Sequence, residues 1–101
     1  MNKSTVSEVL SNAFGSDFSK ATQEQRLLLL EAVALSLRKG GAWQHNLNLV
    51  CSRAKDSQMP SSCTPSIWIE INRNEGLKLL AILNVAIVEG YSVVAASERL
   101  R

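Results

Sequence analysis

The chain has 101 residues, of which 46% are hydrophobic and 20% charged, and its formal net charge is +2. This length predicts one domain, residues 1–101, that can bury a modest core. A charge so close to neutral argues against a strongly basic nucleic-acid coat and equally against an acidic mimic of DNA.

The two cysteines, Cys51 and Cys63, are expected to be free thiols. No apolar core follows the first residues, as it would in a secretory signal peptide. We therefore expect a cytoplasmic protein in reducing conditions, in which Cys51 is buried as a small apolar side chain on one face of a helix. A disulfide between the two cysteines is the alternative.

Two threonine-based capping sequences predict where the first two helices begin. Residues 5–8 (Thr-Val-Ser-Glu) precede apolar residues at helical spacing, and this helix is expected to end before Gly15. Residues 22–25 (Thr-Gln-Glu-Gln) open a second helix that runs to Lys39 and stops at Gly40. Leucine, valine and alanine fill most of the second helix, so we place it at the centre of the fold.

A third helix is expected from about Ala42 to Lys55, followed by a serine-rich loop over residues 56–64. Trp43 falls on the apolar face of this helix. Leu49 lies beside its polar face, as a single exposed apolar residue.

Residues 67–71 (Ile-Trp-Ile-Glu-Ile) fit either a strand or a short helix. Alternating β-branched residues favour a strand, whereas the preceding Thr64-Pro65 is typical of a helix start. We favour a helix, because a lone strand in a helical chain has nothing to pair with.

The most apolar segment spans residues 77–88, where only Lys78 and Asn84 are polar. These two residues lie about 120° apart on a helical wheel, so the helix has no continuous polar face. It must be covered by protein on most sides, and it is too short to cross a bilayer.

Asn74 and Gly90 are typical of the two ends of this helix, and Ser92 is typical of the cap of a last helix. The predicted fold class is therefore all-α, a compact bundle of about five or six short helices. Two of them, at about 22–39 and 75–89, are highly apolar and are expected at its centre.

Residues that converge in enzyme active sites are scarce. The one histidine, His45, lies on a different helical face from Cys51, which excludes a cysteine–histidine nucleophilic pair within this helix. No cysteine pairs, histidine pairs or carboxylate clusters occur at metal-ligand spacing, and no glycine-rich loop could cradle a phosphate. We expect no enzymatic activity, no metal and no cofactor.

A basic stretch lies between Glu31 and Asp56, where no acidic residue occurs. It contains Arg38, Lys39, His45, Arg53 and Lys55. Four arginine and lysine side chains can hold phosphates. They also stand near the C-terminal ends of two expected helices, where positive charge complements the helix dipole, and we favour this second interpretation.

Residues 83–96 loosely resemble a helix-turn-helix, with Ala86 four residues before Gly90 and Ser92 capping the next helix. The resemblance implies a DNA-binding regulator. The expected recognition helix, however, opens with valines and alanines at 93–96, where such motifs carry side chains that read base edges. We interpret the junction as an ordinary helical corner and keep a nucleic-acid-binding transcriptional regulator as an alternative.

The apolar excess favours interaction with protein. The second helix is expected to expose Leu27 on one flank of its polar stripe and Leu28 with Leu35 on the other. Our main hypothesis is a non-enzymatic adaptor or inhibitor that binds a protein partner stoichiometrically. Small motif-free chains are common among phage and mobile-element proteins that block a host nucleic-acid-processing complex, such as a CRISPR effector. A self-associating structural protein is a further alternative.

The candidate partner-binding surface lies within residues 38–55, whose exposed faces carry little charge density. The residues expected to contact the partner are Arg38, Lys39, His45, Asn48, Ser52, Arg53 and Lys55. The near-neutral charge predicts blockade by contact with protein rather than by mimicry of DNA, and we expect no contact with a membrane.

Overall fold

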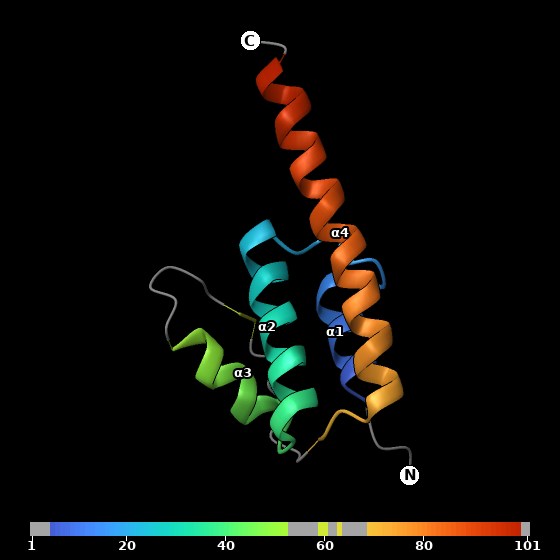
Figure 1. The fold of residues 1–101 in the computed structure, drawn as a ribbon, viewed down its shortest axis with the longest axis vertical. Coiled ribbons are helices and arrows are strands. Elements are labelled where there is room, and N and C mark those ends of the chain that lie inside the picture. Colours follow the sequence, from blue (N-terminus) through green and yellow to red (C-terminus); the bar gives the residue numbers. More distant parts are fainter. Residues whose placement is uncertain (1–4, 53–58, 61–62, 64–68, 100–101) are drawn as a thin grey trace.

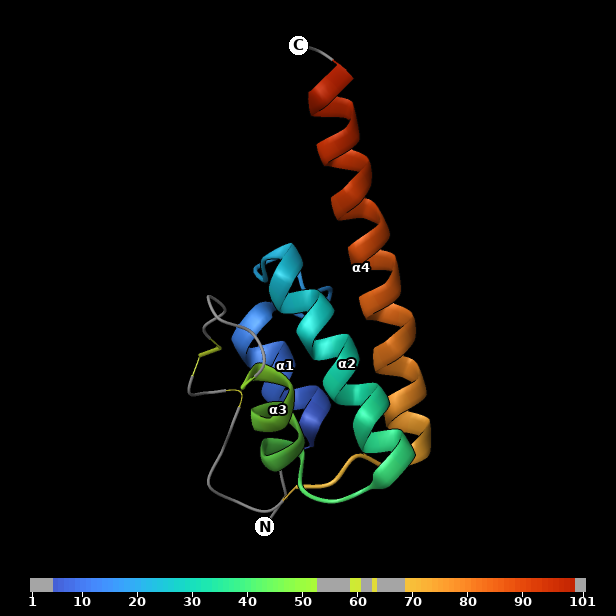
Figure 2. The same ribbon diagram turned by 60° about the vertical axis from the view of Figure 1, so that its left-hand side comes forward.

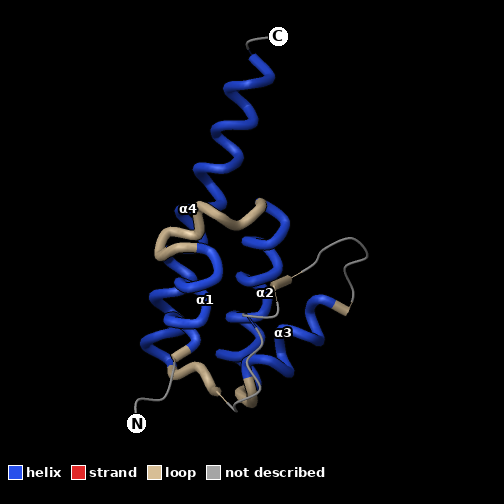
Figure 3. The backbone as a smooth tube through the Cα atoms, turned by 180° about the vertical axis from the view of Figure 1, so that it is seen from behind, coloured by secondary structure: helices blue, strands red, loops and turns tan. Residues whose placement is uncertain are grey.

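The computed structural model describes residues 5–52, 59–60, 63 and 69–99, and this part of the chain contains four α-helices and no strand (Figures 1 and 3). The helices are α1 (Val6–Phe14), α2 (Gln23–Lys39), α3 (Trp43–Cys51) and α4 (Arg73–Arg99). The predicted all-α class is confirmed. The expected count of about five or six helices is wrong for the described residues, and the difference arises near the C-terminal end.

The first two helices begin and end at the signals expected from the sequence. The Glu8 backbone N–H donates to Thr5 Oγ1 at 3.1 Å. At the start of α2, the Gln25 N–H donates to Thr22 Oγ1 at 3.1 Å and the Thr22 N–H donates to Gln25 Oε1 at 2.9 Å, which completes a capping box. Gly40 ends α2 at φ 72°, a conformation that residues with a side chain rarely adopt.

Helices α1, α2 and α4 lie side by side, and α3 leans on the side of α2 that is turned away from α4 (Figures 1 and 2). All four helices contribute to one hydrophobic core. Its large buried members include Val6, Leu10, Phe14, Phe18, Leu29, Val33, Trp43, Leu47, Leu79 and Leu83. Burial of this apolar surface is the main favourable term in folding, at about 25 cal/mol per Å² removed from water.

The C-terminal part of the chain forms one long helix instead of the two that were expected. It begins after Asn72, whose side chain caps its first turn, and not after Asn74. It then continues through Gly90, and Ser92 Oγ donates to the Val88 carbonyl at 3.1 Å within the helix rather than capping a new one. The corner expected at this point, and with it the turn of the helix-turn-helix resemblance, is absent.

Gly90 allows a close approach between two helices rather than ending one. A Cβ at this position would collide with Gln23 at the start of α2. Because glycine has no Cβ, the Gln23 side chain fits against α4, and its Nε2 donates to the Ile87 carbonyl at 2.7 Å. Gly76 has the same role near the other end of α2, where a Cβ would lie 2.8 Å from Leu37 Cγ. The two glycines therefore leave room for the side chains of Leu37 and Gln23 where α2 packs on α4.

The third helix ends at Cys51 in the described part of the chain. Residues 53–58, which include the rest of the helix expected up to Lys55, lie outside the described residues, as does most of the loop expected at 56–64. The predicted start of α3 is accurate to one residue, since α3 begins at Trp43.

The ambiguous segment at 67–71 is only partly described, because residues 67 and 68 lie outside the described residues. Residues 69–71 form neither a helix nor a strand, so the helix favoured there is wrong for these three. The Ile69 carbonyl accepts a hydrogen bond from the Trp43 N–H at 2.7 Å, which holds this segment against the start of α3.

Helix α4 extends beyond the other helices (Figures 1 and 2). Its 27 residues rise about 40 Å, whereas the two shorter dimensions of the molecule are 27 and 23 Å. The part of α4 up to Gly90 packs on α2, and the part that follows has no other described helix beside it. No helix among the described residues is long and apolar enough to cross a membrane.

Candidate protein-binding groove

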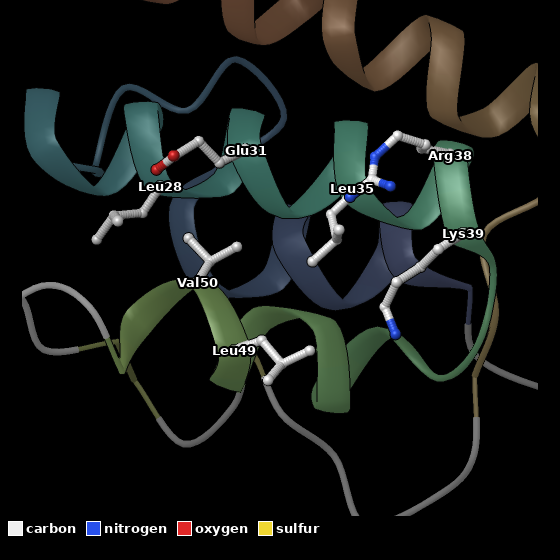
Figure 4. Close-up of a pocket in the computed structure, with 7 residues that line it drawn as sticks. All are labelled: Leu28, Glu31, Leu35, Arg38, Lys39, Leu49 and Val50. Atoms are coloured by element: carbon white, nitrogen blue, oxygen red, sulfur yellow. The ribbon is translucent and has the colours of Figure 1, made fainter.

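A groove lies between α2 and α3, and we call it the α2–α3 groove (Figure 4). Its lining side chains are Leu28, Glu31, Leu35, Arg38, Lys39, Leu49 and Val50. The four apolar side chains form its floor, with the leucines of α2 facing the residues of α3, and the three charged ones come from α2. Its volume of about 580 Å³ is within the range of protein ligand sites.

The groove depends on buried residues that hold α3 in place. Trp43, the first residue of α3, is completely buried. Its indole Nε1–H donates to the Cys63 carbonyl at 2.8 Å, and its backbone N–H donates to the Ile69 carbonyl. Because a buried indole N–H needs such a partner, these two bonds fix the beginning of α3 against the segments that follow it in sequence.

Asn46 ties α3 to the end of α2. Its Nδ2 donates to Ser36 Oγ at 2.9 Å and to the Gly40 carbonyl at 3.1 Å. Ser36 Oγ donates in turn to the Ala32 carbonyl at 2.8 Å. Asn46 is completely buried, and its Oδ1 has no hydrogen-bond partner among the described residues, so the amide depends on the two bonds of Nδ2, which fix how the two walls of the groove meet.

The charges of the groove are separated along its length. Glu31 lies at one end, and Arg38 and Lys39 lie at the other (Figure 4). All three are exposed. Glu31 and Arg38 are separated by about 10 Å along the helix axis. A ligand that follows the groove is therefore expected to carry opposite charges at its two ends.

The residues predicted to bind a partner are only partly brought together. Two of them line the groove: Arg38 and Lys39. Three are exposed on or at the end of α3 without lining the groove: His45, Asn48 and Ser52. Two lie outside the described residues: Arg53 and Lys55. The basic stretch is thus divided between one end of the groove and the outer face of α3.

The apolar floor of the groove was not predicted as a site. Leu28, expected at the surface, is buried, and Leu35 is half-buried. Leu49 is 42% exposed, as expected, but it contributes to the groove and is not an isolated surface residue. The sequence feature that indicates this floor is the seven-residue spacing of Leu28 and Leu35, which places both leucines on one face of α2.

Both cysteines are free thiols with raised pKa values. Burial raises the pKa of the Cys63 thiol to about 11, and the neighbouring Cys51 adds to the shift. Burial, and then the Glu31 carboxylate, raises the pKa of the Cys51 thiol. Since the thiolate is the reactive form, the raised pKa values lower the reactivity of both side chains.

No group of three or more histidine, cysteine, aspartate or glutamate residues in the described part of the chain could hold a metal ion. Comparison of the chain with protein-family models, with curated proteins and with solved structures finds no match. The function of the α2–α3 groove is therefore argued from its own shape and charge.

Proposed function

We propose that this chain is a non-enzymatic adaptor or inhibitor that binds a protein partner stoichiometrically, and that the partner binds in the α2–α3 groove. The observation that carries the proposal is an apolar floor with opposite charges at its two ends. A groove of this kind between two helices suits the apolar face of an amphipathic helix, which inserts side chains at helical spacing.

The charges define the orientation of that partner helix. Its acidic residue faces Arg38 and Lys39, and its basic residue faces Glu31 at the other end. Charges at the rim of an interface mainly steer and orient the partner, whereas apolar side chains buried at the centre supply most of the affinity. Leu35 and Leu49 are the central contacts on this chain.

The test is affinity capture from a lysate of the source cells with the tagged full chain, with and without nuclease. We expect one nuclease-resistant protein in a fixed ratio to the chain. Leu49→Glu places a carboxylate on the groove floor at an exposed position, and it is expected to reduce recovery at least about tenfold. Val85→Glu, the same kind of change at an exposed position of α4, is the matched control and keeps recovery unchanged.

A second pair of variants tests the charged end of the groove. Lys39→Glu is expected to reduce recovery about two- to fivefold, because it repels the acidic residue of the partner. Lys20→Glu, an equal charge change in the loop before α2, leaves recovery unchanged. Recovery that is lost on nuclease treatment would favour the nucleic-acid alternative, and recovery that Leu49→Glu leaves intact would contradict the groove as the binding site.

A further inference from the structure

A second exposed apolar surface lies on α4, and we call it the α4 stripe. It consists of uncharged, exposed residues: Leu77, Ala81, Asn84, Val85, Val88 and Tyr91. The four large apolar members, Leu77, Val85, Val88 and Tyr91, are each between 51% and 56% exposed. A single exposed apolar residue needs no explanation, but a continuous stripe of them is typical of an interaction site.

The stripe occupies the side of α4 opposite its buried face. At about 100° per residue it covers roughly 120° of the helix, and Leu79, Leu83 and Ala86 lie on the other side, against the core. In Figure 2, α4 stands at the edge of the molecule with the other helices on one side of it. Lys78 and Glu89, both exposed, border the same edge of the stripe.

We propose that the α4 stripe is an interface between two copies of this chain, in which the two α4 helices run antiparallel about a two-fold axis near Asn84. In such a pair each residue faces one of the second copy, and the two residue numbers add to a constant. A constant of about 166–168 brings together the charges and most of the side-chain sizes of the stripe.

The charges are self-complementary in this register. Lys78 faces Glu89 of the second copy, and the two-fold axis repeats the pair, so that two opposite-charge contacts flank the stripe. The antiparallel direction is required, because it brings the same edge of each helix together. A parallel pair would set this edge against the opposite one, where Leu80 lies, and Lys78 would have no acidic partner there.

The side-chain sizes are self-complementary in the same register. Leu77 faces Tyr91, and the small Ala81 faces the larger Val85, so large and small residues alternate across the contact. Asn84 faces Asn84 of the second copy, where each amide can donate to and accept from the other. A single asparagine in an otherwise apolar helix seam is a known way of specifying register and partner number.

Pairing also covers the first turn of α4 beyond Gly90. In this register, residues 91–94 lie beside the first turn of the second copy's α4. A helical end without packing frays in water, because most of the stability of helices in proteins comes from tertiary packing. The second copy supplies the neighbour that one chain does not provide.

The size of the contact predicts a weak dimer. The two helices overlap over about 33 Å, and with a width of about 10 Å the footprint is roughly 300 Å² per copy. Stable interfaces bury about 800 Å² per partner. We therefore expect a reversible dimer with a Kd in the micromolar range, and not an obligate dimer.

Sedimentation equilibrium of the full chain, in reductant and from about 5 to 500 µM, tests the interface. The wild type is expected to form dimers. Val85→Glu, and independently Val88→Glu, is expected to remain monomeric with an unchanged helical circular dichroism spectrum, because both positions are exposed. Leu49→Glu, in the α2–α3 groove, keeps the dimer. A wild type that is monomeric throughout, or a dimer that neither α4 variant weakens, would overturn the proposal.

A charge exchange tests the antiparallel register. Lys78→Glu and Glu89→Lys each place like charges opposite one another twice, and each is expected to weaken dimerisation about tenfold. The variant that carries both changes restores the opposite-charge pairs and is expected to recover the wild-type Kd to within about threefold. If the double variant dimerises no better than the single ones, the antiparallel register is wrong.

Discussion

The α2–α3 groove and the α4 stripe are both apolar and exposed, but they differ in shape and in charge. The groove is concave, is built from two helices, and carries Glu31 at one end with Arg38 and Lys39 at the other. The α4 stripe is convex, is built from one helix, and has no charged member. A concave surface with separated charges selects a different molecule that complements it, whereas a convex uncharged stripe can pair with its own copy.

The two surfaces also depend on different parts of the core. The groove requires α3 to stay against α2, and this contact rests on Trp43 and Asn46. The α4 stripe requires only that α4 stays helical and stays on α2. A change that loosens α3 is therefore expected to remove the groove and leave the stripe, and this separates the two proposed activities experimentally.

The largest expected effect comes from Trp43→Ala. It removes a completely buried indole and leaves a cavity under α3, which costs about 3–5 kcal/mol in the free energy of unfolding. Denaturant unfolding measures this loss. Partner recovery is expected to fall with it, while sedimentation equilibrium still detects the dimer at concentrations where the chain is folded.

Trp43→Phe is the matched control for this prediction. It keeps an aromatic ring in the core and removes the hydrogen bond to the Cys63 carbonyl, so we expect a smaller loss of about 1–2 kcal/mol. Equal losses for the two variants would show that the hydrogen bond, and not the packing of the indole, anchors α3.

The next effect in size is that of Asn46→Ala, with an expected loss of about 1–3 kcal/mol, because the Gly40 carbonyl loses its buried donor. Asn48→Ala is the control on the exposed face of the same helix and is expected to change stability by less than about 0.5 kcal/mol. Thermal unfolding measures both. A partner affinity that Asn46→Ala leaves unchanged would contradict a role for this amide in setting the groove.

The sequence predicted those features that depend on near neighbours. The caps at Thr5 and Thr22 and the end of α2 at Gly40 each involve residues within about one turn. At Gly90 the same reasoning failed. A glycine at a helix end and a glycine at a helix contact look alike in sequence, and the contact is with Gln23, in another helix.

The candidate groove was predicted only in its basic part. Arg38 and Lys39 are recognisable from their position in a stretch without acidic residues. The apolar floor joins Leu35 on α2 to Leu49 on α3, and that juxtaposition depends on the angle between the two helices. No local pattern encodes this angle, because it is set by buried residues such as Asn46.

The smallest predicted effect is a pH dependence on the groove side of the molecule. Burial raises the pKa of Cys63 from 9.0 to about 11, and its carbonyl accepts the Trp43 indole hydrogen bond. Because the folded-state pKa is the higher one, the folded chain holds this proton more tightly than the unfolded chain. The resulting stability is fully present below pH 9 and is lost as the pH rises toward 11.

We expect the wild type to lose roughly 1–2 kcal/mol more than Cys63→Ala between about pH 8 and pH 11. The alanine variant has no thiol at this position, so its own cavity cost is the same at every pH and cancels in the difference. Denaturant unfolding of both proteins across this range measures the difference. If the two profiles fall in parallel, the Cys63 thiol is not buried in solution as it is in the structure.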